Sequence, residues 1–223
     1  MRFGFEDRRQ AGRVLAEKLS SYADRDNVVV LALPRGGVPV AFEVAMALRA
    51  PLDVFVVRKL GVPGQEELAF GAIASNGARA LNSGLVRVLG ITQPMIERIT
   101  ERETLELERR EKLYRPSLPP ADVRGKTVII VDDGLATGAT MRVAVEALKK
   151  KAPREIIVAI PIGSKETCAE FAASADALCV CAVTPEPFYG VGIWYQDFSQ
   201  TTDDEVRALL DQAQTVTTDR WAA

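Results

Sequence analysis

The chain has 223 residues, 48% of them hydrophobic and 26% charged, which is ordinary for a globular protein and enough for one domain with an ample core. The formal net charge of −2 argues against a general nucleic-acid binder. No apolar stretch is long enough to span a bilayer, and the N-terminus lacks the apolar core of a signal peptide, so we expect a cytoplasmic protein.

The chain contains no histidine, which excludes Ser-His-Asp and Cys-His catalysis as well as metal sites built on imidazole. Its three cysteines, Cys168, Cys179 and Cys181, show no C-x-x-C spacing. We therefore expect neither a zinc site nor a disulfide framework, and we interpret the cysteines as small core residues.

Hydrophobic periodicity predicts alternating helices and strands along the first third of the chain. We expect a helix over 7–22, a strand over 28–33, a helix over 38–48, a strand over 52–57, a Gly/Pro loop over 61–68 and a strand over 69–75. Two strand–helix units followed by a further strand indicate a parallel sheet.

The turn between the first strand and its helix contains Pro34, Arg35, Gly36 and Gly37. Two glycines before a helix N-terminus leave backbone amides open to an anion. Arg35 adds a positive charge that suits a phosphate group. The turn is therefore a candidate anion site, and the alternative is a simple strand-to-helix connection.

A second candidate segment begins at Arg58 and Lys59, where two cations end a strand and lead into a glycine-containing loop over 60–71. Such a segment is typical of a mobile lid that closes over a substrate. Glu66 and Glu67 lie within this loop. A surface hairpin with incidental charges is the alternative, and for Glu66 it explains the pattern about equally well.

Residues 93–114 are very rich in charge and carry only a thin apolar stripe. Glu106 and Arg110 lie four residues apart with opposite charges, a spacing that favours a helix, and Pro116 marks its end. We interpret the segment as a long exposed helix that packs on the core or on a second subunit and has no chemical role.

The most specific motif follows residues 127–131, whose β-branched side chains predict a strand buried on both faces. Asp132 and Asp133 come next, followed by a loop of small and hydroxyl residues over 136–140 and a helical pattern. The loop amides and the helix dipole favour a phosphate, whereas carboxylates accept hydrogen bonds from ribose hydroxyls. The motif thus predicts a site for a phosphorylated sugar, and the alternative is an ordinary buried strand with an acidic turn.

The last third of the chain continues the alternation, with strands expected over 155–160 and 177–183 and a helix over 203–212. The densest aromatic cluster lies at residues 184–198 and includes Phe188 and Tyr189. An aromatic face can stack on a base. Packing of the segment against the core is the better explanation for Trp194 and Tyr195.

Residues 128–140 resemble the motif for 5-phosphoribosyl-1-pyrophosphate (PRPP) of type I phosphoribosyltransferases. The turn 34–37 resembles the pyrophosphate loop of that family, in which a cis non-proline peptide often occurs. Residues 58–71 resemble its mobile loop, in a wording similar to that of a distinct bacterial branch. The resemblance covers the family core from residue 28 to 160. Gly134 departs from the family, which usually has an aliphatic residue there.

The resemblance implies an α/β fold, the type I phosphoribosyltransferase fold, in which helices flank a Rossmann-like parallel sheet. We expect one phosphoribosyltransferase domain over residues 1–223. Within it we place an inserted helical segment near residues 84–124 and a small C-terminal hood near residues 184–200 that binds the base. A homodimer is the usual assembly of the family.

The resemblance also assigns site residues. The expected PRPP-binding residues are Arg35, Gly36, Gly37, Asp132, Asp133, Ala136, Thr137, Gly138, Ala139 and Thr140. The two aspartates face the ribose hydroxyls and contact the metal. Arg58 and Lys59 assist catalysis by touching pyrophosphate. Phe188 or Tyr189 corresponds to the residue that stacks on the base.

The acid or base that handles the acceptor's proton is expected in the mobile loop. Hypoxanthine/guanine enzymes carry an aspartate at the position of Ala136, so its absence argues against a 6-oxopurine substrate. The wording here is closer to that of adenine enzymes, which place a glutamate in the mobile loop. Glu66 or Glu67 fits that role by this resemblance.

The implied reaction is magnesium-dependent displacement of pyrophosphate from C1 of PRPP by a nucleobase or a similar nitrogen acceptor, as in nucleotide salvage. Mg²⁺ is the implied cofactor, and a small-molecule base or amine is the implied partner, with no nucleic acid or membrane. Two alternatives stay open. One is a non-catalytic PRPP-binding regulator of nucleotide metabolism, and the other is a structural α/β protein that assembles through helix 93–114.

Overall fold

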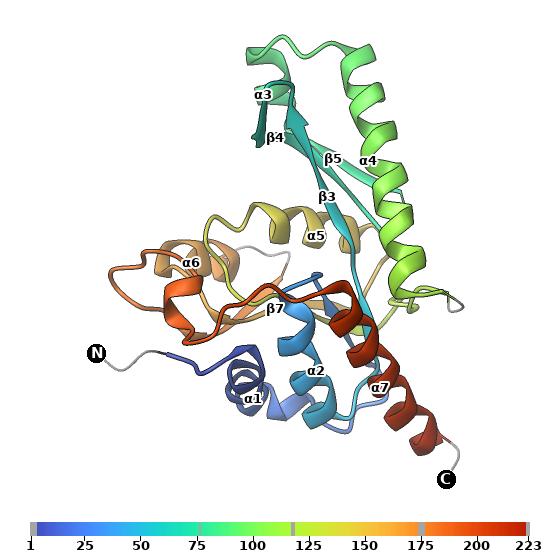
Figure 1. Ribbon diagram of the computed structural model, residues 1–223, viewed down its shortest axis with the longest axis vertical. Coiled ribbons are helices and arrows are strands. Elements are labelled where there is room, and N and C mark those ends of the chain that lie inside the picture. Colours follow the sequence, from blue (N-terminus) through green and yellow to red (C-terminus); the bar gives the residue numbers. More distant parts are fainter. Residues whose placement is uncertain (1–3, 76, 117–118, 174–176, 222–223) are drawn as a thin grey trace.

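A five-stranded parallel sheet forms the core of the computed structural model, which describes residues 4–75, 77–116, 119–173 and 177–221 (Figure 1). The strand order is β2-β1-β6-β7-β8, and all four pairs are parallel. In that order the strands are Leu52–Val54, Val28–Ala32, Thr127–Val131, Glu155–Ile162 and Leu178–Val183. The expected parallel sheet flanked by helices is confirmed.

Helices cover both faces of this sheet (Figure 1). They are α1 (Arg8–Lys18), α2 (Gly37–Leu48), α5 (Ala139–Lys149), α6 (Lys165–Ala173) and α7 (Asp203–Trp221), with short 3₁₀ turns at Ser20–Tyr22 and Gly192–Trp194. Alternate residues of β1 and β6 point to opposite faces: Val30 and Ile129 pack with α1, α2 and α7, whereas Val29 and Ile130 pack with α5 and α6. Because both faces are covered, these strands are uniformly apolar, as the sequence indicates.

The boundaries of several helices and strands differ slightly from the expected ones. Helix α1 ends at Lys18 and is continued by the first 3₁₀ turn, and α7 continues to Trp221 rather than ending at residue 212. The cysteines pack as expected in the core between the sheet, α5 and α6. No helix among the described residues has the length and apolar character that crossing a membrane requires.

Residues 57–114 form an arm that rises from the sheet (Figure 1). Strands β3 (Val57–Val62), β4 (Gln65–Ala74) and β5 (Ala78–Leu81) make a three-stranded antiparallel sheet, and α3 (Ser83–Val88) and α4 (Gln93–Tyr114) complete the arm. The division of the chain into an inserted segment near residues 84–124 and a hood near 184–200 stays a prediction.

The prediction of a loop over residues 61–68 is wrong, because this segment is a β-hairpin that turns at Pro63 and Gly64. Gly64 has φ +78°, the left-handed conformation that a tight turn needs and glycine adopts freely. Leu60 and Phe70, at the two ends of the expected lid, are fully buried. Pairing and burial therefore hold most of the segment as a sheet.

Helix α4 has the predicted bounds, and its thin apolar stripe packs against the arm and the core. Its interpretation as an exposed helix that packs on the core or on a second subunit leaves out one buried charge. Glu103, in the middle of the helix, is a buried carboxylate with 7% of its surface exposed. A buried charge requires a partner, and the partners of Glu103 belong to the site described below.

The end of α4 is fastened to the sheet by a buried ion pair. The Arg115 guanidinium lies 3.2 Å from the Oδ2 atom of Asp53 and also donates to Glu111 at 2.7 Å. Asp53 Oδ2 accepts a further hydrogen bond, from the backbone amide of Ala121. Burial raises the pKa of Asp53, and the positive charge of Arg115 opposes that rise.

We expect Arg115→Ala to lower the free energy of unfolding by about 3 kcal/mol, because it removes the ion-pair partner of the buried Asp53 carboxylate. A carboxyl whose folded-state pKa is raised destabilises the fold increasingly as the pH climbs above its unfolded value of about 3.9. The loss should therefore shrink near about pH 4. Urea denaturation at both pH values measures it.

Arg109→Ala is the matched control, since Arg109 lies on the same helix in an exposed pair with Glu106. Loss of such a pair should cost less than about 1 kcal/mol. Equal losses for the two variants would contradict the account of the buried pair.

Candidate functional site

The carboxyl ends of β1 and β6 lie side by side at the centre of the sheet. Ala32 is paired with Val131, and the amide of Leu33 donates to the Val131 carbonyl at 2.9 Å. The turn after β1 and the acidic pair after β6 therefore meet at one edge, where parallel α/β sheets usually bind ligands. The Pro34–Arg35 peptide in that turn is cis, as the resemblance implies.

Gly36 and Gly37 touch the acidic pair so closely that no side chain fits between them. A Cβ atom at Gly37 would lie 2.7 Å from the Val131 carbonyl oxygen and 2.9 Å from Asp132 Cα. A Cβ atom at Gly36 would overlap with Asp133 Oδ2. Both glycines are therefore required by the contact between the two loops.

The two aspartates have different surroundings. Asp133 Oδ2 accepts a hydrogen bond from Arg8 Nε at 2.9 Å, and its backbone carbonyl accepts one from the Tyr195 hydroxyl at 2.5 Å. Asp132 Oδ1 accepts only from the Asp133 amide among the described residues. One carboxylate is thus held in an ion pair with Arg8, whereas the other has no ion-pair partner among the described residues.

Arg8 is a site residue that the sequence did not reveal. Its Nη1 group donates to the Ser199 carbonyl at 2.7 Å, and its guanidinium lies 4.0 Å from the centre of the Phe198 ring. These contacts come from the segment beyond β8, and Asp133 is 125 residues away from Arg8 in sequence. No local pattern could have paired them.

Burial raises the pKa of the Asp132 carboxyl well above its ordinary value, and the neighbouring Asp133 charge raises it further. Burial also raises the pKa of Asp133, but there the Arg8 guanidinium opposes the rise. The site therefore holds negative charge at a cost that a hydrogen-bonding or cationic ligand would relieve.

The loop over residues 136–140 is shaped by Gly138, which has φ +70° and precedes α5. A Cβ atom at Gly138 would also lie 2.9 Å from Phe171 and from Thr167. The Thr167 hydroxyl donates to the Ala136 carbonyl at 2.7 Å, and Arg142 donates to the Thr137 carbonyl at 2.8 Å.

The amides of this loop, like the first amides of any helix, are available to an anion when no protein acceptor occupies them. No hydrogen bond between described residues uses the amides of residues 136–140. Ala136, Thr137 and Ala139 are exposed, and Thr140 is half-buried. The loop thus has the form expected of a phosphate site.

One pocket of 450 Å³ brings three of the predicted segments together. It is lined by Pro34 of the first turn, by Arg58, Lys59 and Gly61 of β3, and by Thr140 at the start of α5. Arg102 and Glu103 of α4 line it too, although no sequence pattern placed them there. Charge-rich helices carry many such residues, and only the fold shows which of them face a pocket.

Arg35 is not one of the described residues that line this pocket. Its Nη1 atom lies 3.8 Å from Asp203 at the start of α7, and Asp203 also accepts a hydrogen bond from the Tyr114 hydroxyl at 2.5 Å. The Arg35 side chain is directed to these neighbours, and its role in PRPP binding stays a prediction.

The predicted base-binding residues differ in exposure. Phe188 is half-buried and packs with Phe5, Ile162 and Tyr195, whereas Tyr189 is 78% exposed. The expectation that Tyr195 packs this segment against the core is confirmed, since it is buried and contacts Phe5. The stacking role of Phe188 or Tyr189 stays a prediction.

A steric contact explains why this chain has glycine at position 134 in place of an aliphatic residue. A Cβ atom there would overlap with Val191 Cγ1, so the valine occupies the space that an aliphatic residue at position 134 would fill. The backbones of Glu66 and Glu67 lie in β4, and their side chains fall outside the part of the chain that the structure describes.

The carboxylates of this site fit a Mg²⁺ ion whose coordination is shared between the protein and the substrate. Mg²⁺ prefers oxygen ligands and is commonly held by one or two carboxylates together with substrate phosphates and water. Asp132 and Asp133 supply such carboxylates, and no cluster of three or more acidic or thiol ligands occurs among the described residues. The protein would thus hold the ion through Asp132 and Asp133 while substrate oxygens complete its coordination.

We expect Asp132→Asn to raise the free energy of unfolding by about 1 kcal/mol near neutral pH, the size of many stabilising substitutions. Between about 3.9 and the raised pKa, the folded protein binds more protons than the unfolded chain, so this carboxyl destabilises the fold as pH rises. Urea denaturation should show little change near about pH 4.

The exposed Asp26→Asn variant serves as the control and should leave stability unchanged at both pH values. A less stable Asp132→Asn protein at neutral pH would contradict the electrostatic cost assigned to Asp132.

Comparison with known proteins agrees with the geometry of these loops. A family model described as "Phosphoribosyl transferase domain" matches residues 6–176. Two proteins of Mycobacterium tuberculosis, "Putative phosphoribosyl transferase MT0597" of strain CDC 1551 / Oshkosh and "Putative phosphoribosyl transferase Rv0571c" of strain ATCC 25618 / H37Rv, are 47% identical over 209 residues. This match covers 94% of this chain and 47% of each relative, so the chain spans about half the length of these curated relatives.

Among solved structures, that of the protein TT1426 from Thermus thermophilus is 41% identical in sequence, with a TM-score of 0.81. The similarity covers 93% of this chain and 98% of that chain. Together with the paired loops, the acidic pair and the phosphate loop, these matches show that the chain belongs to the phosphoribosyl transferase domain family.

Proposed function

We propose that this protein transfers the 5-phosphoribosyl group of PRPP to a nitrogen acceptor, a nucleobase or a small amine, and releases pyrophosphate. The observation that carries the proposal is the meeting of three segments at one sheet edge. These are the turn 34–37, the acidic pair with its loop at 132–140, and the cationic strand that contains Arg58 and Lys59.

In the proposed reaction the bond between C1 and the pyrophosphate oxygen breaks, and a bond from the acceptor nitrogen to C1 forms. No covalent intermediate with the protein is needed, which suits a chain without histidine. The protein's contribution is to position the two substrates and to stabilise the charge of the leaving group.

Each segment has its own part in this scheme. Amides of the loop 136–140 and the hydroxyls of Thr137 and Thr140 bind the 5′-phosphate. Asp132 and Asp133 accept hydrogen bonds from the ribose hydroxyls, and Arg8 holds Asp133 in place. Mg²⁺ held by the two carboxylates would supply positive charge to the departing pyrophosphate.

The pyrophosphate would lie in the 450 Å³ pocket, against Arg58 and Lys59 and close to the turn that contributes Pro34. Of the two glycines in that turn, only Gly36 is proposed to offer its amide, because the Gly37 amide donates to the Leu33 carbonyl at 3.1 Å. Strand β3 of the β3–β4 hairpin lines this pocket, so the hairpin would limit the access of water to C1. Phe188 or Tyr189 is proposed to stack on the base, and a homodimer is the proposed assembly.

The first test is binding of PRPP with Mg²⁺, measured by isothermal titration calorimetry. We expect the wild-type chain to bind and the double variant Asp132→Asn, Asp133→Asn to lose binding by more than about 100-fold, because two charge-assisted contacts to the ribose disappear. Circular dichroism should show an intact fold. Unchanged affinity in the double variant would remove the acidic pair from the site.

A matched double variant, Asp26→Asn with Asp211→Asn, removes two exposed carboxylates that are distant in sequence from Asp132 and Asp133. It should bind PRPP as the wild type does. Pyrophosphate release across a panel of purines, pyrimidines and amines then names the acceptor. Binding of PRPP without release for any acceptor would favour the non-catalytic regulator instead.

We also propose that Glu66 or Glu67 exchanges a proton with the acceptor nitrogen. General acid–base groups typically contribute about 10²–10⁴-fold to a rate, so one of the two Gln substitutions should lower kcat by about that factor with little change in the KM for PRPP. Glu97→Gln, an exposed change on α4, is the control. Full turnover in both Glu66→Gln and Glu67→Gln would end this proposal.

A further inference from the structure

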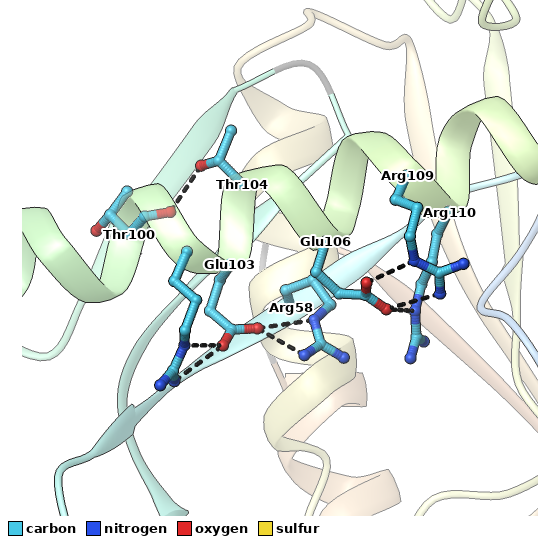
Figure 2. Close-up of polar contacts among 8 residues, drawn as sticks. Arg58, Thr100, Glu103, Thr104, Glu106, Arg109 and Arg110 are labelled. Atoms are coloured by element: carbon cyan, nitrogen blue, oxygen red, sulfur yellow. Dashed lines mark hydrogen bonds and ion pairs between the residues drawn. The ribbon is translucent and has the colours of Figure 1, made fainter.

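Glu103 forms hydrogen bonds with Arg58 and with a second arginine, Arg102 (Figure 2). All three residues line the 450 Å³ pocket. Its Oε2 atom accepts hydrogen bonds from Arg58 Nε at 2.9 Å and from Arg58 Nη2 at 2.6 Å. Its Oε1 atom lies 3.1 Å from Arg102 Nε and 3.0 Å from Arg102 Nη2. Each carboxylate oxygen thus holds one guanidinium, one from β3 and the other from α4.

Burial makes this arrangement specific. The Glu103 side chain is 9% exposed, whereas those of Arg58 and Arg102 are 27% and 65% exposed. A buried carboxylate is costly unless it is paired, so Glu103 holds both guanidinium groups in defined positions. The arginines reach outward from it toward solvent and the pocket.

The arginines keep donors for a ligand. A guanidinium has five N–H donors in a planar fork, and Glu103 engages the Nε and Nη2 atoms of each arginine. The Nη1 groups of Arg58 and Arg102 donate to no described residue. Such forks suit the bidentate binding of phosphate oxygens.

The pocket as a whole is positively charged. Among the described residues that line it, Arg58, Lys59 and Arg102 carry positive charges and Glu103 the single negative charge. Three cations around one cavity attract a multiply charged anion. A pyrophosphate, with two phosphoryl groups, matches two forks placed side by side better than a single phosphate does.

We propose that Arg102 is a further pyrophosphate-binding residue, and that Glu103 is the positioning residue that holds Arg58 and Arg102 as a paired clamp. The proposal rests on the proposed function and extends it to α4. The helix thereby acts as one wall of the leaving-group pocket, and its contact with β3 fixes the distance between the two cations.

A second cluster on the same helix provides a control. Glu106 accepts hydrogen bonds from Arg109 and Arg110 in a similar way, and these bonds lower its pKa to about 2 (Figure 2). The Arg109 side chain is 58% exposed, close to the exposure of Arg102, but Arg109 does not line the pocket. The two arginines therefore differ in position rather than in charge or exposure.

The test measures binding of inorganic pyrophosphate with Mg²⁺, and of PRPP with Mg²⁺, to the full chain by calorimetry. Arg102→Ala should weaken pyrophosphate binding by about 10–100-fold, the loss typical of a charge-assisted hydrogen bond. Arg109→Ala should bind as the wild type does. Equal affinities for Arg102→Ala and the wild type would overturn the role of Arg102.

Glu103→Gln separates positioning from charge. Removing a carboxylate makes the pocket more positive, so a Glu103 that only offset the cations would, on substitution, let pyrophosphate bind more tightly. A positioning residue gives the opposite sign, because Arg58 and Arg102 lose their shared anchor, and we expect binding about 10-fold weaker. Tighter binding would overturn the positioning role.

Turnover and folding complete the design. If PRPP turnover is detected, Arg102→Ala should raise the KM for PRPP more than it lowers kcat. Thermal unfolding of Glu103→Gln checks that this variant is folded at the assay temperature. A wild-type chain that binds neither PRPP nor pyrophosphate would overturn the proposed function together with this inference. Normal PRPP binding with no effect of Arg102→Ala would overturn the inference alone.

Discussion

The contact between two backbone loops is the constraint on which the site depends. Gly36 and Gly37 lie against Asp132 and Asp133 with no room for a Cβ atom. This contact exists because β1 and β6 are neighbours in the sheet and end at the same level. It places the Gly36 amide, which suits an anion, next to carboxylates that suit sugar hydroxyls. One strand pairing thereby brings together groups that would bind the two parts of a single charged substrate.

Charged groups of the site are held by counter-charges from elements outside the central sheet. Asp133 is held by Arg8 of α1, Arg58 by Glu103 of α4, and Arg35 by Asp203 of α7. Such pairs fix side chains whose free rotation would otherwise cost entropy on binding. A ligand therefore meets an arrangement that is already ordered, and it exchanges contacts with these pairs instead of organising loose side chains.

The sequence predicted the parts that depend on local pattern. Strand 127–131 and helix 93–114 have the expected bounds because a continuous β-branched run and opposite charges four residues apart are strong local signals. The hairpin at 57–74 was predicted only as an alternative to a mobile loop, because glycines and charges interrupt its alternation and its strands are stabilised by partners in the arm. Arg8 and Glu103 were missed for a related reason: their roles arise from neighbours distant in sequence, which no local pattern records.

Gly134 and Val191 show how the segment beyond β8 is tied to the acidic turn. The valine side chain fills the space that a larger residue at position 134 would need. The two positions therefore form a pair of complementary volume, in which one member can grow only if the other shrinks. Relatives with an aliphatic residue after the acidic pair are expected to carry a small residue opposite it. Such paired exchange would let the segment over the acidic turn change shape while the turn itself stays in place.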